Sequence, residues 1–269
     1  ASRELVVDLA RDHAPESVDY IVYATASGLK DFAPFSALKA VLNMWAGVED
    51  VVENPTLTVP LARMVDPGLT EGMVEWVTGH VLRYHLDIDR VLAAQNGAWD
   101  RHIPPLARER AVGVLGLGQL GTAVSQALAA LNFDVAGWAR REKQIDGIAC
   151  HHGASGLETL LARSEIVVLL LPLTQETENT LNARTLALMP NGACILNPGR
   201  GALIDDAALL ASLAAGQIAH ATLDVFRYEP LPPYLPTWPH PTVTATPHIA
   251  AYTRPATAAY VIAENIRRN

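Results

Sequence analysis

The alternation of strand-like and helix-like segments between residues 111 and 247 constrains the fold of this chain more than any other feature of its sequence. Short apolar or β-branched runs, such as AVGVLGLG and EIVVLLLP, are followed by stretches rich in alanine and leucine. Parallel strands need long crossover connections, which are usually helices, so this pattern predicts an α/β, doubly wound parallel sheet. We expect strands at residues 111–118, 134–139, 165–172, 193–197, 220–226 and 242–247, and helices at residues 119–131, 156–164, 183–189 and 205–216.

The region before residue 111 predicts a second, smaller body. Its strand-like runs are residues 4–9, 20–25 and 38–44, and residues 70–99 are predicted to form one long helix with Thr70 as its N-cap. The pair Pro104-Pro105 separates this region from the alternating segments. A chain of 269 residues is also longer than one hydrophobic core usually serves, so we expect two domains.

Composition excludes several classes of partner. The formal net charge of −8 argues against nucleic acid or an anionic membrane as the main partner. No apolar stretch is long enough to span a bilayer, and the charged N-terminal segment does not resemble a signal peptide. The two cysteines, Cys150 and Cys194, lack metal-ligand spacing and fit a reducing compartment. We therefore expect a cytoplasmic protein without a bound metal.

The segment VGVLGLGQLG places Gly116, Gly118 and Gly121 in the GxGxxG spacing. The motif follows a predicted strand and opens a predicted helix, which is the context that a dinucleotide pyrophosphate site requires. The glycines permit a tight turn, close approach of backbone to phosphate, and close packing of helix on strand. We expect Gln119 and Leu120, in the first helical turn, to contact the cofactor at the positive end of the helix dipole. A glycine-rich turn without a ligand is the less favoured alternative.

The end of the second strand bears on which dinucleotide is bound. Sites for NAD usually place an Asp or Glu there to accept hydrogen bonds from the ribose hydroxyls. This chain has Arg140 and Arg141 instead, and its first carboxylate is Glu142. Guanidinium groups pair with a 2′-phosphate, so the sequence favours NADP(H), with NAD(H) as the second possibility. The alternative is a solvated basic end of the loop, to which Lys143 would also belong.

Three polar side chains follow later strands of the same series. Arg200, Glu229 and His248 come after residues 193–197, 220–226 and 242–247, where an open α/β sheet binds its ligands. Each is weak evidence by itself, because a lone histidine or glutamate in a loop is more often an ordinary hydrogen-bonded or solvated residue. Together they form a complete set, in which arginine binds a carboxylate, histidine transfers a proton, and glutamate holds the histidine in its charged form.

The motifs GLGQLG, NPGRGALID, LDVFRYEPLP and TPHIAAYT, in this order and spacing, resemble the D-isomer-specific 2-hydroxy-acid dehydrogenase family. WAGVED, EPLPP and PHIAAYTRPA are most similar to its glyoxylate/hydroxypyruvate reductase A branch. The resemblance implies a Rossmann dinucleotide-binding domain at residues 87–249 and a discontinuous, flavodoxin-like substrate domain at residues 1–86 and 250–269. That domain normally opens with one more strand–helix unit, and the last helix stops without an ending signal. We therefore expect the chain to be a trimmed piece of a longer one.

The same resemblance implies roles for individual residues. Arg200 would bind the substrate carboxylate and keto oxygen, His248 would donate the proton to that oxygen, and Glu229 would pair with His248. The other implied cofactor contacts are Leu171, Pro172, Pro198, Asp224 (to the nicotinamide carboxamide), His248 and Ala250. The implied substrate contacts, besides Arg200 and His248, are the backbone of Ala46, Gly47 and Val48, with Trp45 lining the pocket.

The activity implied is NADPH-dependent reduction of small 2-oxo acids, glyoxylate to glycolate and hydroxypyruvate to glycerate. Glu229 argues against a formate dehydrogenase, which has glutamine there, and the arginines at 140 and 141 point away from a phosphoglycerate dehydrogenase. A phosphoglycerate- or lactate-type dehydrogenase is the alternative within the enzyme class. An NAD(H)-sensing, corepressor-like binding protein is the alternative outside it. The family also implies a homodimer, with the helix from Thr70 near the interface.

Overall fold

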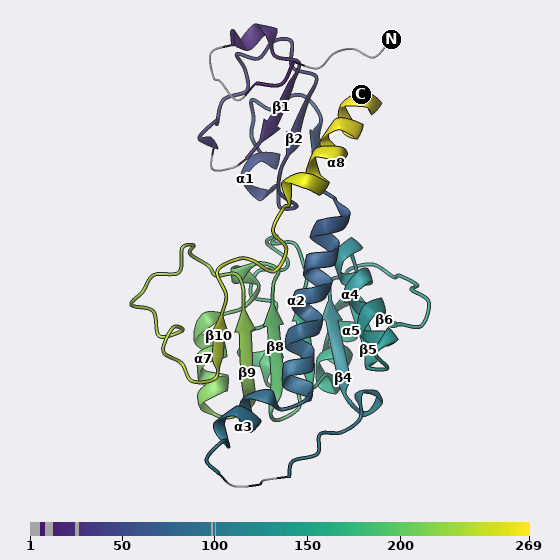
Figure 1. Cartoon of the computed structure of the whole chain (residues 1–269), viewed down its shortest axis with the longest axis vertical. Helices are drawn as coiled ribbons and strands as arrows, with labels where there is room; N and C mark the ends of the chain where they lie inside the picture. The colour runs from purple at the N-terminus through teal and green to yellow at the C-terminus, as the bar shows by residue number, and fades with distance from the viewer. Residues whose placement is uncertain (1–5, 9–12, 25–26, 98, 100) are drawn as a thin grey trace. The chain divides into compact units, whose positions relative to one another are not determined.

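The computed structural model describes residues 6–8, 13–24, 27–97, 99 and 101–269 of the chain (Figure 1). It divides into two compact units, residues 1–68 with 253–269, and residues 69–252. The larger unit carries the predicted alternation of strands and helices. Among the described residues, no helix combines the length and apolar character needed to cross a membrane.

A seven-stranded, all-parallel sheet forms the centre of the larger unit, in the order β10-β9-β8-β7-β4-β5-β6. The chain runs outward from β4 to β6, returns to pair β7 with β4, and then continues to β10. This reversal confirms the predicted doubly wound topology, and the carboxyl ends of all the strands meet at one edge. The strands are β4 (Ala111–Leu115), β5 (Asp134–Ala139), β6 (Ala149–His152), β7 (Ile166–Leu169), β8 (Ala193–Asn197), β9 (Ile218–Leu223) and β10 (Val243–Ala245).

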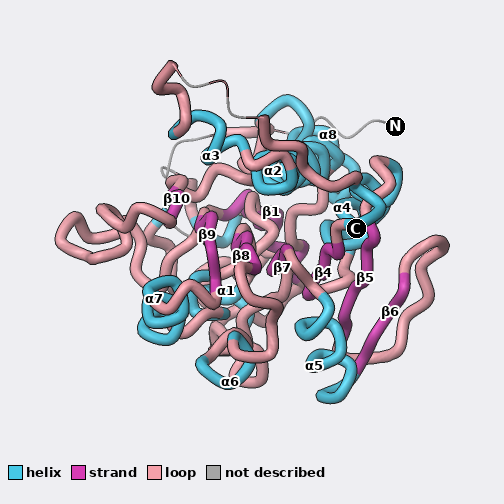
Figure 2. The backbone as a smooth tube through the Cα atoms, turned by 90° about the horizontal axis from the view of Figure 1, so that it is seen from below, coloured by secondary structure: helices cyan, strands magenta, loops and turns pink. Residues whose placement is uncertain are grey.

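Helices cover both faces of this sheet because its strands are apolar on both faces. Along β4, Val112 and Val114 pack into one buried cluster with α2 and α4, whereas Leu115 belongs to a second cluster with α5, α6 and α7. Figure 2 shows the same layering, with the row of strands between the two sets of helices. The helices of the larger unit are α2 (Pro67–His85), α3 (Ile88–Ala93), α4 (Gln119–Ala130), α5 (Gly153–Arg163), α6 (Ala183–Leu186) and α7 (Asp206–Ala214), with 3-10 turns η3 (Ala107–Glu109) and η4 (Gly201–Leu203).

The predicted helix 70–99 is wrong in its extent. The structure has two helices, α2 and α3, separated at Asp87, whose φ of 50° lies in the left-handed region. Nor is Thr70 the N-cap, because α2 begins three residues earlier at Pro67. The Asp66 side chain accepts a hydrogen bond from the Gly68 amide at 2.7 Å and so satisfies one of the free donors of the first turn.

The two units divide at other residues than the sequence predicts, because of where α2 packs. The predicted boundaries were 86/87 and 249/250, whereas the structure divides at 68/69 and 252/253. The buried face of α2, formed by Met73, Val77 and Val81, packs in the same core cluster as the central strands of the large sheet. Burial of this apolar face joins nearly all of α2 to the larger unit.

The smaller unit contains a three-stranded parallel sheet in the order β1-β2-β3. Its buried core includes Tyr23, Phe32 and Val41. The strand predicted at residues 4–9 is wrong where it can be examined, since residues 6–8 form no strand, and residues 4, 5 and 9 lie outside the described residues. Val6 and Val7 are 87% and 81% exposed, so they lack the burial that stabilises a strand. The elements are η1 (Pro15–Ser17), β1 (Tyr20–Tyr23), β2 (Ala40–Asn43), α1 (Glu49–Val52), β3 (Leu61–Ala62) and α8 (Pro255–Arg268).

Two half-buried histidines, one on α2 and one on β9, predict acid sensitivity of the larger unit. Burial lowers the pKa of His80 and of His220, and His220 lies against the Tyr84 ring and 3.3 Å from the Thr244 hydroxyl. The unfolded chain therefore binds protons first, near the ordinary histidine pKa of about 6.5, and stability falls as the pH drops through that value. We expect the melting temperature to fall between about pH 7.5 and about pH 5.5. His220→Gln should reduce this fall, whereas the exposed control His152→Gln should not; equal falls in all three proteins would contradict the prediction.

Candidate active site

The three glycines of the phosphate loop are needed for different structural reasons. Gly116 has a φ of 105°, and a Cβ there would lie 2.4 Å from the Leu170 carbonyl oxygen. A Cβ on Gly121 would lie 1.8 Å from the Gly116 carbonyl oxygen, so these two positions are set by the protein's own backbone. Gly118, at the N-terminus of α4, has an ordinary φ of −74°, and a Cβ there would meet nothing within 4 Å. The open space beside Gly118 fits a phosphate group approaching the helix N-terminus.

The basic segment after β5 extends beyond the two arginines. Arg140 pairs with Glu176 at 3.1 Å, and both side chains are about 70% exposed, so this pair is weak and Arg140 can turn to another anion. The ammonium group of Lys143 donates to the Leu117 carbonyl oxygen inside the phosphate loop. The sequence named Lys143 only under the alternative of a solvated basic loop end. This contact places a third cation beside the phosphate loop, and only the tertiary structure shows it.

The turn after β8 holds Arg200 rigidly at the carboxyl edge of the sheet. The Asn197 side chain donates to the Arg200 carbonyl oxygen at 2.9 Å and accepts from the Gly199 amide at 3.1 Å. A Cβ on Gly201 would lie 1.9 Å from the carbonyl carbon of Phe226, so this turn packs directly against the loop after β9. Arg200 is half-buried, and its guanidinium donates a hydrogen bond to the Gly199 carbonyl oxygen at 2.7 Å. Sequence reasoning missed Asn197, which fixes this turn.

His248 and Glu229 form a hydrogen-bonded pair across the ends of β10 and β9. His248 Nδ1 lies 2.7 Å from Glu229 Oε2, while Glu229 Oε1 accepts from the Phe226 amide at 2.9 Å. The imidazole is about half exposed, and its backbone φ of 55° is unusual for a residue other than glycine. Because Nδ1 faces a carboxylate, Nε2 is the ring nitrogen left to donate a proton to a ligand.

Asp224 anchors the turn that carries His248. Its carboxylate is fully buried and accepts hydrogen bonds from the Thr246 hydroxyl, the Ile249 amide and the Ala250 amide. Its own carbonyl oxygen accepts from the His248 amide at 2.8 Å. The predicted contact of Asp224 with the nicotinamide carboxamide stays a prediction. A buried carboxylate that receives three donors holds the strained backbone of the turn in place.

The remaining predicted site residues fall into two groups. Leu171, Pro172 and Pro198 follow β7 and β8 at the same edge as Arg200, and Ala250 is buried in the turn held by Asp224. Residues 45–48 follow β2 in the smaller unit, where the Asn43 amide donates to the carbonyl oxygens of Trp45 and Gly47 at 3.0 and 2.6 Å. That side chain, which sequence reasoning also missed, shapes the loop formed by Trp45, Ala46, Gly47 and Val48.

A doubly wound sheet, a glycine cradle at a helix N-terminus and an adjacent histidine–carboxylate pair define a dehydrogenase that uses a nicotinamide dinucleotide. Residues 79–250 match the family model of the D-isomer specific 2-hydroxyacid dehydrogenase, NAD binding domain. The chain belongs to the D-isomer-specific 2-hydroxyacid dehydrogenase family. This confirms the predicted family, fold class and class of cofactor, and it makes the protein an NAD(P)-dependent oxidoreductase of small 2-hydroxy and 2-oxo acids.

Solved structures of relatives agree with this assignment. A D-isomer specific 2-hydroxyacid dehydrogenase from Xanthobacter autotrophicus Py2, in complex with NADPH and MES, is 46% identical with a TM-score of 0.90, covering 96% of this chain and 82% of that one. A probable 2-hydroxyacid dehydrogenase from Rhizobium etli CFN 42, in complex with NADP, HEPES and L(+)-tartaric acid, is 30% identical with a TM-score of 0.86, covering 96% and 83%. The NADPH-dependent glyoxylate/hydroxypyruvate reductase of Sinorhizobium meliloti, in complex with NADP and sulfate, is 36% identical with a TM-score of 0.84, covering 94% and 81%.

Proposed function

We propose that the protein reduces glyoxylate and hydroxypyruvate with NADPH. The observation that carries the proposal is the His248–Glu229 pair, with Nδ1 and Oε2 2.7 Å apart, at the sheet edge that also presents Arg200. A proton donor and a guanidinium at one edge of the sheet are the combination that reduction of a 2-oxo acid needs. The similarity to a reductase of this specificity from Sinorhizobium meliloti supports the choice of substrates.

Substrate binding and proton donation are carried out by different residues of the chain. The Arg200 guanidinium binds the substrate carboxylate and keto oxygen, because its planar donors match two oxygens at once. His248 donates a proton from Nε2 to the keto oxygen while Glu229 keeps the ring oriented through Nδ1. The bound dinucleotide supplies the hydride.

The test is oxidation of NADPH, followed by absorbance, with glyoxylate, hydroxypyruvate and pyruvate in turn. We expect substrate-dependent oxidation with glyoxylate or hydroxypyruvate. Turnover of a different 2-oxo acid alone would favour a lactate- or phosphoglycerate-type enzyme. Tight binding of NADH without turnover of any 2-oxo acid would favour a nucleotide-sensing binding protein. Either result would refute the proposed substrates.

The preference for NADPH rests on the cations after β5. Arg140→Asp should shift the ratio of kcat/KM for NADPH over NADH toward NADH by at least about tenfold, because it replaces a charge-assisted contact with repulsion of the 2′-phosphate. Glu176→Gln is the matched control, since it removes the partner of Arg140 but keeps the guanidinium. It should leave NADPH preferred. An unchanged ratio in Arg140→Asp would show that this arginine does not bind the phosphate.

We also propose a cytoplasmic homodimer. The support for a dimer is the exposed apolar surface of α3 and the segment after it, which adjoin the C-terminal end of α2. Leu92, Trp99, Ile103 and Leu106 are 59%, 93%, 77% and 54% exposed. Sedimentation of a monomer at micromolar concentration would refute the dimer, and recovery from a membrane or secreted fraction would refute the location.

A further inference from the structure

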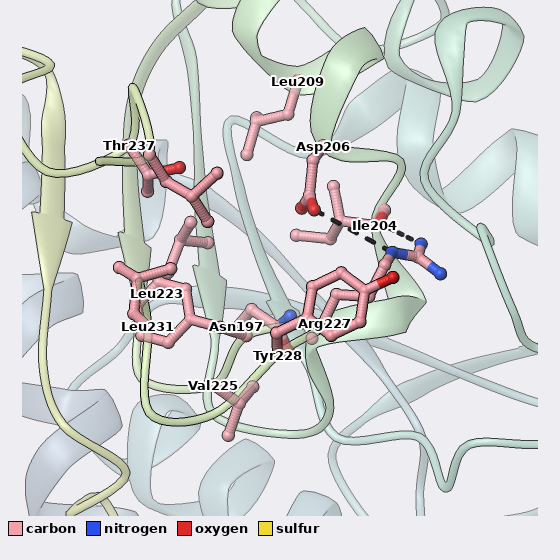
Figure 3. A pocket seen from close by; sticks show the side chains of 13 residues that line it. Asn197, Ile204, Asp206, Leu209, Leu223, Val225, Arg227, Tyr228, Leu231 and Thr237 are labelled. Atoms are coloured by element: carbon pink, nitrogen blue, oxygen red, sulfur yellow. Dashed lines mark hydrogen bonds and ion pairs between the residues drawn. The ribbon is translucent and has the colours of Figure 1, made fainter. Parts of the chain in front are cut away.

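The side chain of Arg227, in the loop after β9, donates hydrogen bonds to several groups of neighbouring loops. Its Nη1 donates to Glu178 Oε1 at 2.9 Å, and its Nη2 donates to Asn179 Oδ1 at 2.7 Å and to the Ile204 carbonyl oxygen at 3.1 Å. Its Nε lies 3.9 Å from Asp206 Oδ2. Figure 3 shows the side chain directed from its loop toward Asp206 and Ile204 at the edge of a pocket. The Arg227 side chain is only 27% exposed, so these contacts are partly shielded from water.

The partners of Arg227 come from two other loops of the same sheet edge. Glu178 and Asn179 lie in the connection after β7, which begins with the proposed cofactor contacts Leu171 and Pro172. Ile204 and Asp206 lie in the connection after β8, which contains Arg200. Arg227 therefore joins the three loops that carry proposed cofactor, substrate and histidine-orienting groups.

Arg227 is connected to His248 through its neighbour Phe226 and through Glu229. Its neighbour Phe226 donates its amide to Glu229 Oε1 at 2.9 Å, and the other oxygen of that carboxylate lies 2.7 Å from His248 Nδ1. The Phe226 backbone is also pressed against Gly201, where a Cβ would come within 1.9 Å of its carbonyl carbon. The segment 226–229 is thus fixed by backbone contact on one side and by the guanidinium on the other.

We propose that Arg227 is a positioning residue, which holds the 226–229 segment so that Glu229 keeps His248 oriented for proton donation. The proposal rests on the proposed reduction for its kinetic consequence. A planar guanidinium suits this task, because it can donate to acceptors in two different loops at once. An ion pair with Glu178 alone, on an exposed surface, would contribute little.

The kinetic test is a double-mutant cycle between Arg227→Met and Glu229→Gln. We expect Arg227→Met to lower kcat by about 10- to 100-fold, because a small displacement of a catalytic group costs this much, with the Kd for NADPH changed by less than about threefold. In the Glu229→Gln background the same change should lower kcat by less than about threefold, since its effect passes through that carboxylate. Arg163→Met is the control, because Arg163 pairs with Asp134 at the opposite edge of the sheet; its kcat should equal the wild type's. Independent, multiplicative losses in the cycle would overturn the proposal.

A second readout does not depend on turnover. Diethyl pyrocarbonate acylates imidazole nitrogens, so His248 should react faster once Glu229 no longer holds its ring through Nδ1, and peptide mapping reports this site alone. Arg227→Met should raise the rate in the same direction as Glu229→Gln, and Glu178→Gln, which keeps the other contacts of Arg227, should raise it less. If the modification rate of His248 rises in Glu229→Gln but in neither Arg227→Met nor Glu178→Gln, the positioning role is overturned. Absence of any 2-oxo acid reduction by the wild type, with these rates as expected, refutes only the proposed function.

Discussion

Replacing His248 by glutamine is expected to lower kcat for 2-oxo acid reduction by ~10²- to 10⁴-fold, the usual range for loss of a positioned proton donor. Glutamine keeps hydrogen-bonding capacity but cannot exchange a proton at neutral pH. The reason is geometric: Nδ1 is taken by Glu229 at 2.7 Å, and the turn around His248 is held by Asp224, so Nε2 is the ring nitrogen left to donate the proton. The KM for the 2-oxo acid and the Kd for NADPH should change much less than kcat.

The control for this variant is His240→Gln, in the irregular loop between β9 and β10. His240 contacts Thr242 rather than Glu229, so its removal should leave kcat within about twofold of the wild type. Steady-state and single-turnover rates measured side by side separate loss of chemistry from slow product release. If His248→Gln retained more than about a tenth of the wild-type single-turnover rate, His248 would not be the proton donor.

Arg200→Lys is expected to raise the KM for glyoxylate or hydroxypyruvate by about 100-fold, because an ammonium group cannot reproduce two parallel hydrogen bonds to a carboxylate. The fixed turn strengthens this expectation. Asn197 holds the backbone of Arg200, so the shorter side chain cannot be brought forward by a shift of the loop. The Kd for NADPH, measured by fluorescence, should change by less than about threefold if the guanidinium serves the substrate.

Arg184→Lys provides the comparison for a generic arginine replacement. Arg184 pairs with Glu158 on the surface and is 65% exposed, and an exposed pair of this kind contributes little. Its KM and kcat should match the wild type's. An Arg200→Lys enzyme with an unchanged KM for every 2-oxo acid tested would remove Arg200 from the substrate site.

Much of the larger unit could be predicted because its signals are local. β5 and β8 have the predicted bounds, since each is an apolar run closed by turn residues. β6 was missed because its sequence ACHH is short and half polar, and pairing with β5 is what makes it a strand. The break between α2 and α3 was missed for a similar reason, as neither glycine nor proline marks the left-handed residue Asp87.

The candidate site shows the same division. Arg200, Glu229 and His248 could be proposed because each follows a predicted strand, and parallel strands bring their carboxyl ends to one edge. Asn197, Lys143 and Arg227 could not, because their side chains act on neighbouring backbone or on other loops through contacts that no local pattern encodes. Asp224 was noticed, but its burial beneath the His248 turn was not foreseen.

The sequence by itself determined the doubly wound sheet, the dinucleotide motif and the family, because hydrophobic periodicity and glycine spacing act over a few residues. Only the tertiary structure decided which side chains meet. It paired His248 with Glu229 across 19 residues, buried Asp224 under the turn that it holds, and gave Arg227 partners in two other loops. Such contacts depend on the order and register of strands, which the packing of the whole unit fixes rather than any one segment.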